Sequence, residues 1–150
     1  MKTSVALVLA LFTLGLSSCG KKISVPGGSV ERDGDQIRIE GGGGSVVAGG
    51  KVSLPEGFPD DVPQPSKKLE MAMTMPQGFT VAFLCEGSIS ENFQKMKKAF
   101  QDEGWEETMA MESGNGSVLG FKKGDNRQVQ CSVGERDGDS IVNLIVSGAP

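Results

Sequence analysis

The apolar residues of the chain fall into three successive patterns. Residues 5–16 form a mostly apolar run without charge. Residues 20–51 carry short apolar runs between many glycines and include no aromatic residue. From Lys68 onward apolar residues recur at the spacings of strands and of a helix, so this last part is expected to hold the folded domain.

The pattern after Lys68 predicts one helix among strands. Ser88 and Glu91 have the spacing of a capping box, and apolar residues then recur at helical spacing up to Phe100. Gly104 is expected to end this helix. Strands bounded by turn-forming residues are expected at 69–75, 79–86, 106–112, 117–122, 128–133 and 140–146.

The predicted order β-β-α-β-β-β-β defines an α+β fold class, in which a single helix packs on an antiparallel sheet. This order resembles helix-grip and related one-helix folds, a likeness of architecture that implies no function. Ahead of the domain, the Asp33-Gly34 pair predicts a hairpin over residues 30–39, and residues 45–47 are expected to add a short strand. Because this segment lacks the residues for a core, a Gly-rich β-ribbon or stalk is expected.

The predicted organisation has four parts. They are a lipoprotein signal peptide over 1–18, a Gly-rich stalk with a short hairpin over 19–53, a Pro-rich linker over 54–67 and the α+β domain over 68–150. The prolines of the linker favour extended or turn conformations, and Phe58 and Val62 are expected to pack it against the domain. The linker motif LPEGFPDDVP, followed by strands and a helix ending in Gly-Trp, resembles a group of uncharacterised bacterial lipoproteins and secreted proteins over residues 25–148. That resemblance implies no activity.

The first twenty residues resemble the signal of a bacterial lipoprotein. Lys2 precedes the apolar run, which is too short as a helix to cross a hydrocarbon core of roughly 30 Å. Leu16-Ser17-Ser18-Cys19 then matches the lipobox, in which cleavage falls between Ser18 and Cys19. The resemblance implies a diacylglycerol on Cys19 and an acyl chain such as palmitate on its amino group, and two or more chains anchor a protein stably to a membrane. The alternative is an ordinary secretory signal that is cleaved near Ser18 and leaves Cys19 as a thiol.

The residue after the lipidated cysteine bears on the final membrane. In enteric bacteria an aspartate there retains a lipoprotein in the inner membrane. Gly20 therefore favours the outer membrane, with the protein facing the periplasm, in a host with two membranes. In a host with one membrane the anchor would hold the protein on the cytoplasmic membrane.

The composition disfavours several classes of function. The chain has 15 Lys and Arg against 19 Asp and Glu, a net charge of -4, which argues against nucleic acid as a partner. It contains no His, the commonest general acid and base and a frequent zinc ligand. No motif supplies a nucleophile with its base, so we expect a protein that is not an enzyme and holds no metal or cofactor.

Two cysteines remain once Cys19 is lipidated. Cys85 and Cys131 are both in phase with apolar residues of predicted strands, so both are expected to face the core. In an oxidising compartment they are a candidate disulfide, which would close a long loop and contribute about 4 kcal/mol on the chain-entropy model. Two buried free thiols are the alternative.

Methionines alternate along two of the predicted strands, at Met71, Met73 and Met75 and at Met109 and Met111. Because methionine packs adaptably, these side chains are a candidate binding face for an apolar ligand or a partner segment. Core packing is the plainer interpretation. The first of the two strands is also a candidate edge strand, open to strand addition.

The pentapeptide Glu-Arg-Asp-Gly-Asp occurs at 31–35 and at 135–139. Two hairpin turns are the better interpretation, because a calcium loop needs more oxygen ligands than these segments offer.

The patterns together predict a lipid-anchored, non-catalytic envelope protein that binds or positions an envelope protein partner. The alternative is a carrier or sensor of a small apolar ligand. A closed pocket above about 300 Å³ beside the methionines would favour the ligand, and a flat apolar patch would favour the protein partner.

Overall fold

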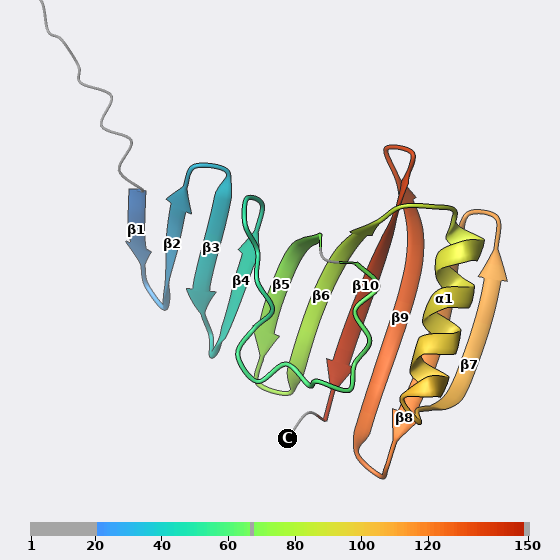
Figure 1. The fold of residues 1–150 in the computed structure, drawn as a ribbon. Helices are drawn as coiled ribbons and strands as arrows, with labels where there is room; N and C mark the ends of the chain where they lie inside the picture. Colours follow the sequence, from blue (N-terminus) through green and yellow to red (C-terminus); the bar gives the residue numbers. More distant parts are fainter. Residues whose placement is uncertain (1–20, 67, 149–150) are drawn as a thin grey trace, which may run out of the picture.

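One antiparallel sheet of ten strands runs through the molecule (Figure 1). The computed structural model describes residues 21–66 and 68–148. The strands are β1 (Lys21–Val25), β2 (Gly28–Asp33), β3 (Gln36–Gly41), β4 (Gly44–Ala48), β5 (Leu69–Met75), β6 (Gly78–Cys85), β7 (Glu106–Ser113), β8 (Gly116–Lys123), β9 (Arg127–Arg136) and β10 (Asp139–Ser147). The one helix in this part of the chain is α1 (Ile89–Asp102).

The strands lie in the order β1-β2-β3-β4-β5-β6-β10-β9-β8-β7. The chain adds neighbouring strands from β1 to β6 and then crosses through α1 to the far edge of the sheet at β7. It returns through β8 and β9, and β10 joins the two halves by pairing with β6, where Val142 lies opposite Phe83. Figure 1 shows β1 and β7 at opposite edges.

The expected fold class, an α+β domain preceded by a β-ribbon or stalk, is wrong. The fold is dominated by its sheet, with 56% of the described residues in strands and 11% in helix. The residues expected to form a separate stalk supply β1–β4, which continue the same sheet because Val46 of β4 pairs with Met73 of β5. The physical reason is that a segment without a core of its own gains backbone hydrogen-bonding partners and side-chain neighbours by pairing with an existing strand, here β4 with β5.

Several individual elements are where the residue pattern predicts them. Strand β5 has the predicted bounds, and the capping box at the start of α1 is present. In it, the Glu91 amide donates to Ser88 Oγ at 3.2 Å, and the Ser88 amide donates to the Glu91 carboxylate at 2.7 Å. Gly104, with φ 77°, ends the helix as predicted, and the Trp105 amide donates to the Phe100 carbonyl at 2.9 Å.

The core lies on one face of the sheet, here called the covered face. One row of cross-strand neighbours on this face consists of Phe83, Val142 and Val133. A second row, two residues away along each strand, consists of Val81, Leu144 and Cys131. Helix α1 contacts β7, β8, β9 and β10 and buries Phe93, Met96 and Phe100. In Figure 1, α1 and the loop of residues 49–66 both lie in front of the sheet.

The Pro-rich segment expected as a linker packs into this core. Phe58 and Val62 are buried, at 9% and 1% exposure. The Phe58 ring meets the Phe79 ring edge to face, with centroids 5.6 Å apart. The segment therefore belongs to the folded unit and stabilises it by apolar burial.

The predicted signal peptide, with Ser18 and Cys19, lies outside the described residues. Among the residues that the structure describes, no helix is long and apolar enough to span a bilayer.

Candidate binding face

The second face of the sheet, opposite the core, is here called the uncovered face. One row of cross-strand neighbours on this face passes through all ten strands. In order from β1 to β7 its members are Ile23, Val30, Ile39, Val46, Met73, Thr80, Ile145, Gln130, Gly120 and Met109. Because side chains alternate along a strand, the positions two residues away lie on the same face. These include Ile37, Met71, Ala82, Val118 and Met111.

The large apolar side chains found exposed in the described chain all lie on the uncovered face. They are Ile23, Ile37, Ile39, Met109, Met111 and Ile145. Exposure is greatest near the two edges of the sheet, at 59% for Ile23 and 64% for Met111. We call Ile23, Ile37 and Ile39 the β1–β3 group, and Ile145, Met109 and Met111 the β7–β10 group. The two groups lie toward opposite ends of the sheet, and each is a candidate contact surface because its apolar side chains are exposed on one face.

The structure places the five candidate methionines on this one face but not in one groove. Met71, Met73 and Met75 lie on β5, where each is half-buried, and Met109 and Met111 lie on the edge strand β7. Strands β6, β10, β9 and β8 separate the two sets. Strand β5 itself is interior to the sheet, paired with β4 and β6, so its expected role as an open edge is wrong.

Two shallow grooves mark the uncovered face. One, of about 430 Å³, is lined by residues of β3, β4 and β5, among them Ile39, Val46 and Met73. The other, of about 310 Å³, includes Met109 and Ile145 in its lining. Both grooves open to solvent and neither is a closed pocket, so this face resembles a contact surface more than a ligand cavity.

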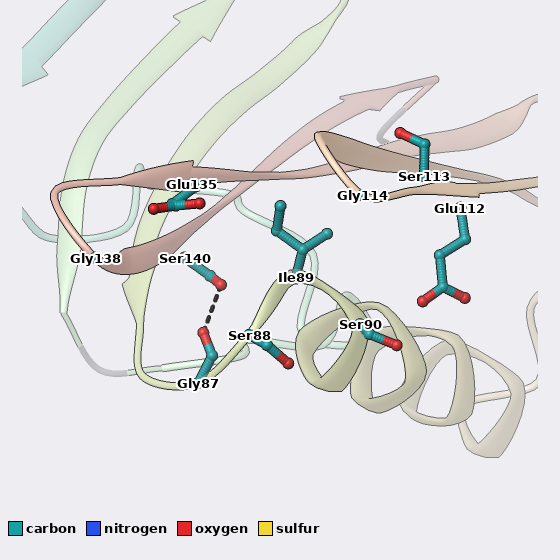
Figure 2. Close-up of a pocket in the computed structure, with 10 residues that line it drawn as sticks. All are labelled: Gly87, Ser88, Ile89, Ser90, Glu112, Ser113, Gly114, Glu135, Gly138 and Ser140. Atoms are coloured by element: carbon teal, nitrogen blue, oxygen red, sulfur yellow. Dashed lines mark hydrogen bonds between the residues drawn. The ribbon is translucent and has the colours of Figure 1, made fainter.

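An open cavity of about 740 Å³ lies at the start of α1, between the β7–β8 and β9–β10 turns (Figure 2). Its lining carries the carboxylates of Glu112 and Glu135 and contains none of the methionines. Figure 2 shows Ser140 pointing to Gly87, and its hydroxyl donates to that carbonyl at 2.6 Å. The Ser88 hydroxyl is engaged in the capping box. The cavity is open to solvent and carries two carboxylates, which does not suit an apolar ligand.

Asp61, in the Pro-rich segment, makes the densest cluster of charged contacts. Its carboxylate accepts two hydrogen bonds from the Arg127 guanidinium, at 2.6 and 2.9 Å, and one from Lys123 Nζ at 2.8 Å. The Arg127 hydrogen bonds hold the pKa of Asp61 well below its ordinary range. The Trp105 indole donates to the Asp61 carbonyl at 2.8 Å, and Arg127 lies over the indole ring at 4.9 Å. This cluster fastens the Pro-rich segment to the sheet and to the end of α1.

Cys85 and Cys131 are buried free thiols on the covered face. Strand β10 lies between their strands, β6 and β9. Two strand spacings amount to about 10 Å, beyond the roughly 7 Å between Cα atoms that a disulfide spans. A bridge would need the backbone to move. Burial raises the pKa of the Cys131 thiol to about 12 and raises the pKa of Cys85 as well.

Both copies of Glu-Arg-Asp-Gly-Asp form hairpin turns, as expected. Within the described part of the chain, no group of three or more His, Cys, Asp or Glu is placed to hold a metal ion.

The residues missed by sequence reasoning are chiefly the exposed isoleucines Ile23, Ile37, Ile39 and Ile145. Alternation in residues 36–41 already placed two of them on one side of a hairpin. The Asp61–Arg127 pair had no sequence signal, because the two residues are 66 positions apart.

No family model, no curated protein and no solved structure matches the chain.

Proposed function

We propose that this protein is a lipid-anchored, non-catalytic accessory module of the bacterial cell envelope that binds a protein partner through the β7–β10 group. The single observation that carries the proposal is the exposed apolar set of Ile145, Met109 and Met111 on the uncovered face. The lipobox at residues 16–19 supports the anchor and the envelope location.

The position of the β7–β10 group suits a partner held away from the anchor. Lys21, at the start of β1, follows Cys19 by two residues, whereas β7 forms the opposite edge of the sheet. Nine strand spacings of about 4.8 Å separate those edges by roughly 43 Å. A partner can therefore bind the β7 edge without contacting the lipid-anchored β1 edge.

The chemistry around the β7–β10 group is that of a protein interface. Its apolar members are flexible methionines and one isoleucine, and methionine adapts to the shape of a partner. Neighbouring side chains on the same face include Gln130, Ser132 and Asn143, which supply hydrogen-bonding groups around the apolar ones. An apolar centre with polar neighbours is typical of such interfaces.

The alternative proposal is a carrier or sensor of a small apolar ligand. The observation that favours it is the groove of about 430 Å³ beside Met73, Met75 and Ile39. Its volume is sufficient for a small ligand. Because the groove is open, a ligand there would remain partly in water, and the protein partner is the better-supported proposal.

Site-specific crosslinking in living cells tests the proposal. A photoreactive residue placed at Ile145 is expected to give one protein adduct of defined mass. The same residue at Gln101, exposed on α1, serves as the matched control and is expected to give none. The adduct should weaken with Met111→Lys at unchanged protein level. Equal labelling from both positions, or none from Ile145, would refute the proposed interface.

A further inference from the structure

We infer that the uncovered face of β1–β4 lies against the surface of the membrane that carries the lipid anchor. This inference rests on the proposed function for the anchor itself. It concerns the β1–β3 group, which the partner interface does not use.

The β1–β4 segment has one apolar face and one polar face. Ile23, Ile37 and Ile39 are 59%, 40% and 46% exposed on the uncovered face. In the cross-strand row of Ile23 and Ile39, Val30 lies between these two residues and Val46 follows Ile39. An exposed aliphatic surface with strand alternation is the sheet counterpart of an interfacial amphipathic helix, which buries its apolar side at the level of the headgroups.

The charges of β2 and β3 are sorted between the same two faces. Arg32 shares the uncovered face, since it pairs with Ile37. The carboxylates lie on the other face, as the pairing of Glu31 with Arg38 and of Ser29 with Glu40 shows, and Asp33 follows the same alternation. The apolar face of these two strands thus carries a guanidinium and no carboxylate, which suits an anionic lipid surface.

Covalent geometry brings this part of the sheet to the anchor. Cys19 precedes Lys21 by two residues, so their Cα atoms are at most about 7 Å apart in any conformation of the chain. A lipid chain on Cys19 therefore holds the β1 edge near the headgroups. Of the two orientations then open to β1–β4, the one that covers Ile23 and Ile39 removes apolar surface from water and keeps Glu31 and Glu40 away from anionic lipid.

Sheet twist allows the two groups on one face to meet different surfaces. Neighbouring strands rotate by roughly 20° each, so six strand intervals turn the face by roughly 120°. Six intervals separate the middle of β2–β3 from the middle of β9–β8 in the strand order. A sheet with this average twist would turn the β7–β10 group away from a bilayer on which β1–β4 lie.

An environment-sensitive fluorophore on the full acylated protein tests the inference. Single cysteines are introduced at Ile39 and, as the matched control on the opposite face of the same strand, at Glu40. Ile37→Cys and Arg38→Cys form a second pair in case one variant folds poorly. The native thiols Cys85 and Cys131 are buried. Labelling the unsubstituted protein in the same way measures any fluorophore that these two thiols take up. Each labelled protein is reconstituted into vesicles of phosphatidylethanolamine and phosphatidylglycerol.

The expected result is a blue-shifted emission at positions 37 and 39 that brominated lipids quench, with an unshifted emission at 38 and 40. Protein that stays on the vesicles with all four positions in water would overturn the inference and leave the anchor intact. Protein that does not stay on the vesicles would overturn the anchor and the inference together. A shift at position 39 that appears in detergent and grows with protein concentration would assign the face to a second copy of the chain and overturn the membrane contact.

Discussion

The Asp61 carboxylate accepts hydrogen bonds from both terminal nitrogens of the Arg127 guanidinium, at 2.6 and 2.9 Å, although the two residues are 66 positions apart in the sequence. This pair joins the Pro-rich segment to the first residue of β9. Lys123 donates a third hydrogen bond to this carboxylate. It also donates to the carbonyl of Glu103, the C-cap residue of α1. The loop, the helix end and two strands are therefore held at one point on the covered face.

Replacing Asp61 tests whether these hydrogen bonds stabilise the fold. The side chains of Asp61 and Arg127 are 27% and 24% exposed, so the pair is only partly screened by water. Asp61→Asn removes the charge and is expected to lower the free energy of unfolding by about 2 kcal/mol in denaturant titration at neutral pH. Asp60→Asn, the exposed neighbour, is the control and should change it little. Equal effects of both substitutions would contradict the role of Asp61.

The same pair predicts a dependence of stability on acid pH. The pKa of Asp61 is lowered from its ordinary value of 3.8, chiefly by the hydrogen bonds from Arg127. A carboxyl with a lowered pKa contributes stability above its unfolded value, and that contribution is lost as the pH falls below about 4. The difference in unfolding free energy between the wild type and Asp61→Asn should therefore shrink on acidification. A difference that stays constant down to about pH 2 would show that the ionised carboxylate is not the stabilising form.

The Pro-rich segment should behave as part of the core in a truncation test. Phe58→Ala removes a ring that is 9% exposed and packs on Phe79, so a loss of about 3 kcal/mol is expected. Glu56→Ala, an exposed position in the same segment, should have little effect. Thermal unfolding of the two variants makes the comparison. If the Phe58→Ala protein is as stable as the wild type, residues 54–66 form a linker that does not contribute to the core.

Cys85 and Cys131 should be reduced and unreactive in the native protein. Both are buried, and raised pKa values disfavour the reactive thiolate. Alkylation without reductant is expected to modify neither in native buffer and both in denaturant, as intact mass would show. Because the pKa of Cys131 is about 12 when folded, against 9.0 ordinarily, stability should fall as the pH rises above about 9. Failure to alkylate both in denaturant until reductant is added would indicate a disulfide instead.

Local elements were predictable from the sequence because local chemistry fixes them. The capping box at Ser88, the stop at Gly104 and the strand over residues 69–75 depend on neighbours a few residues away. The single ten-stranded sheet was not predictable in this way. It depends on the pairing of Ala48 with Met71 across the Pro-rich segment, which no local pattern specifies.

Hairpin register shows the same limit on a smaller scale. In the first Glu-Arg-Asp-Gly-Asp copy Asp33 pairs with Gln36, so the turn residues are Gly34 and Asp35. In the second, Arg136 pairs with Asp139, and the turn shifts to Asp137 and Gly138. Identical pentapeptides thus turn one residue apart, because the faces of the flanking strands set the register. The candidate face was likewise only half predicted, since its methionines could be named but the isoleucines that complete it depend on that register.

Methionine oxidation in the intact envelope tests the central claim, that a partner covers the β7–β10 group, most directly. Met109 and Met111 are 41% and 64% exposed, and Met96, at 1%, is an internal reference in the core. Dilute peroxide should oxidise Met109 and Met111 quickly in the purified protein and slowly in intact cells, with Met96 slow in both. Peptide mass spectrometry reads all three rates. Equal rates for Met109 and Met111 in cells and in the purified protein would contradict a covered face.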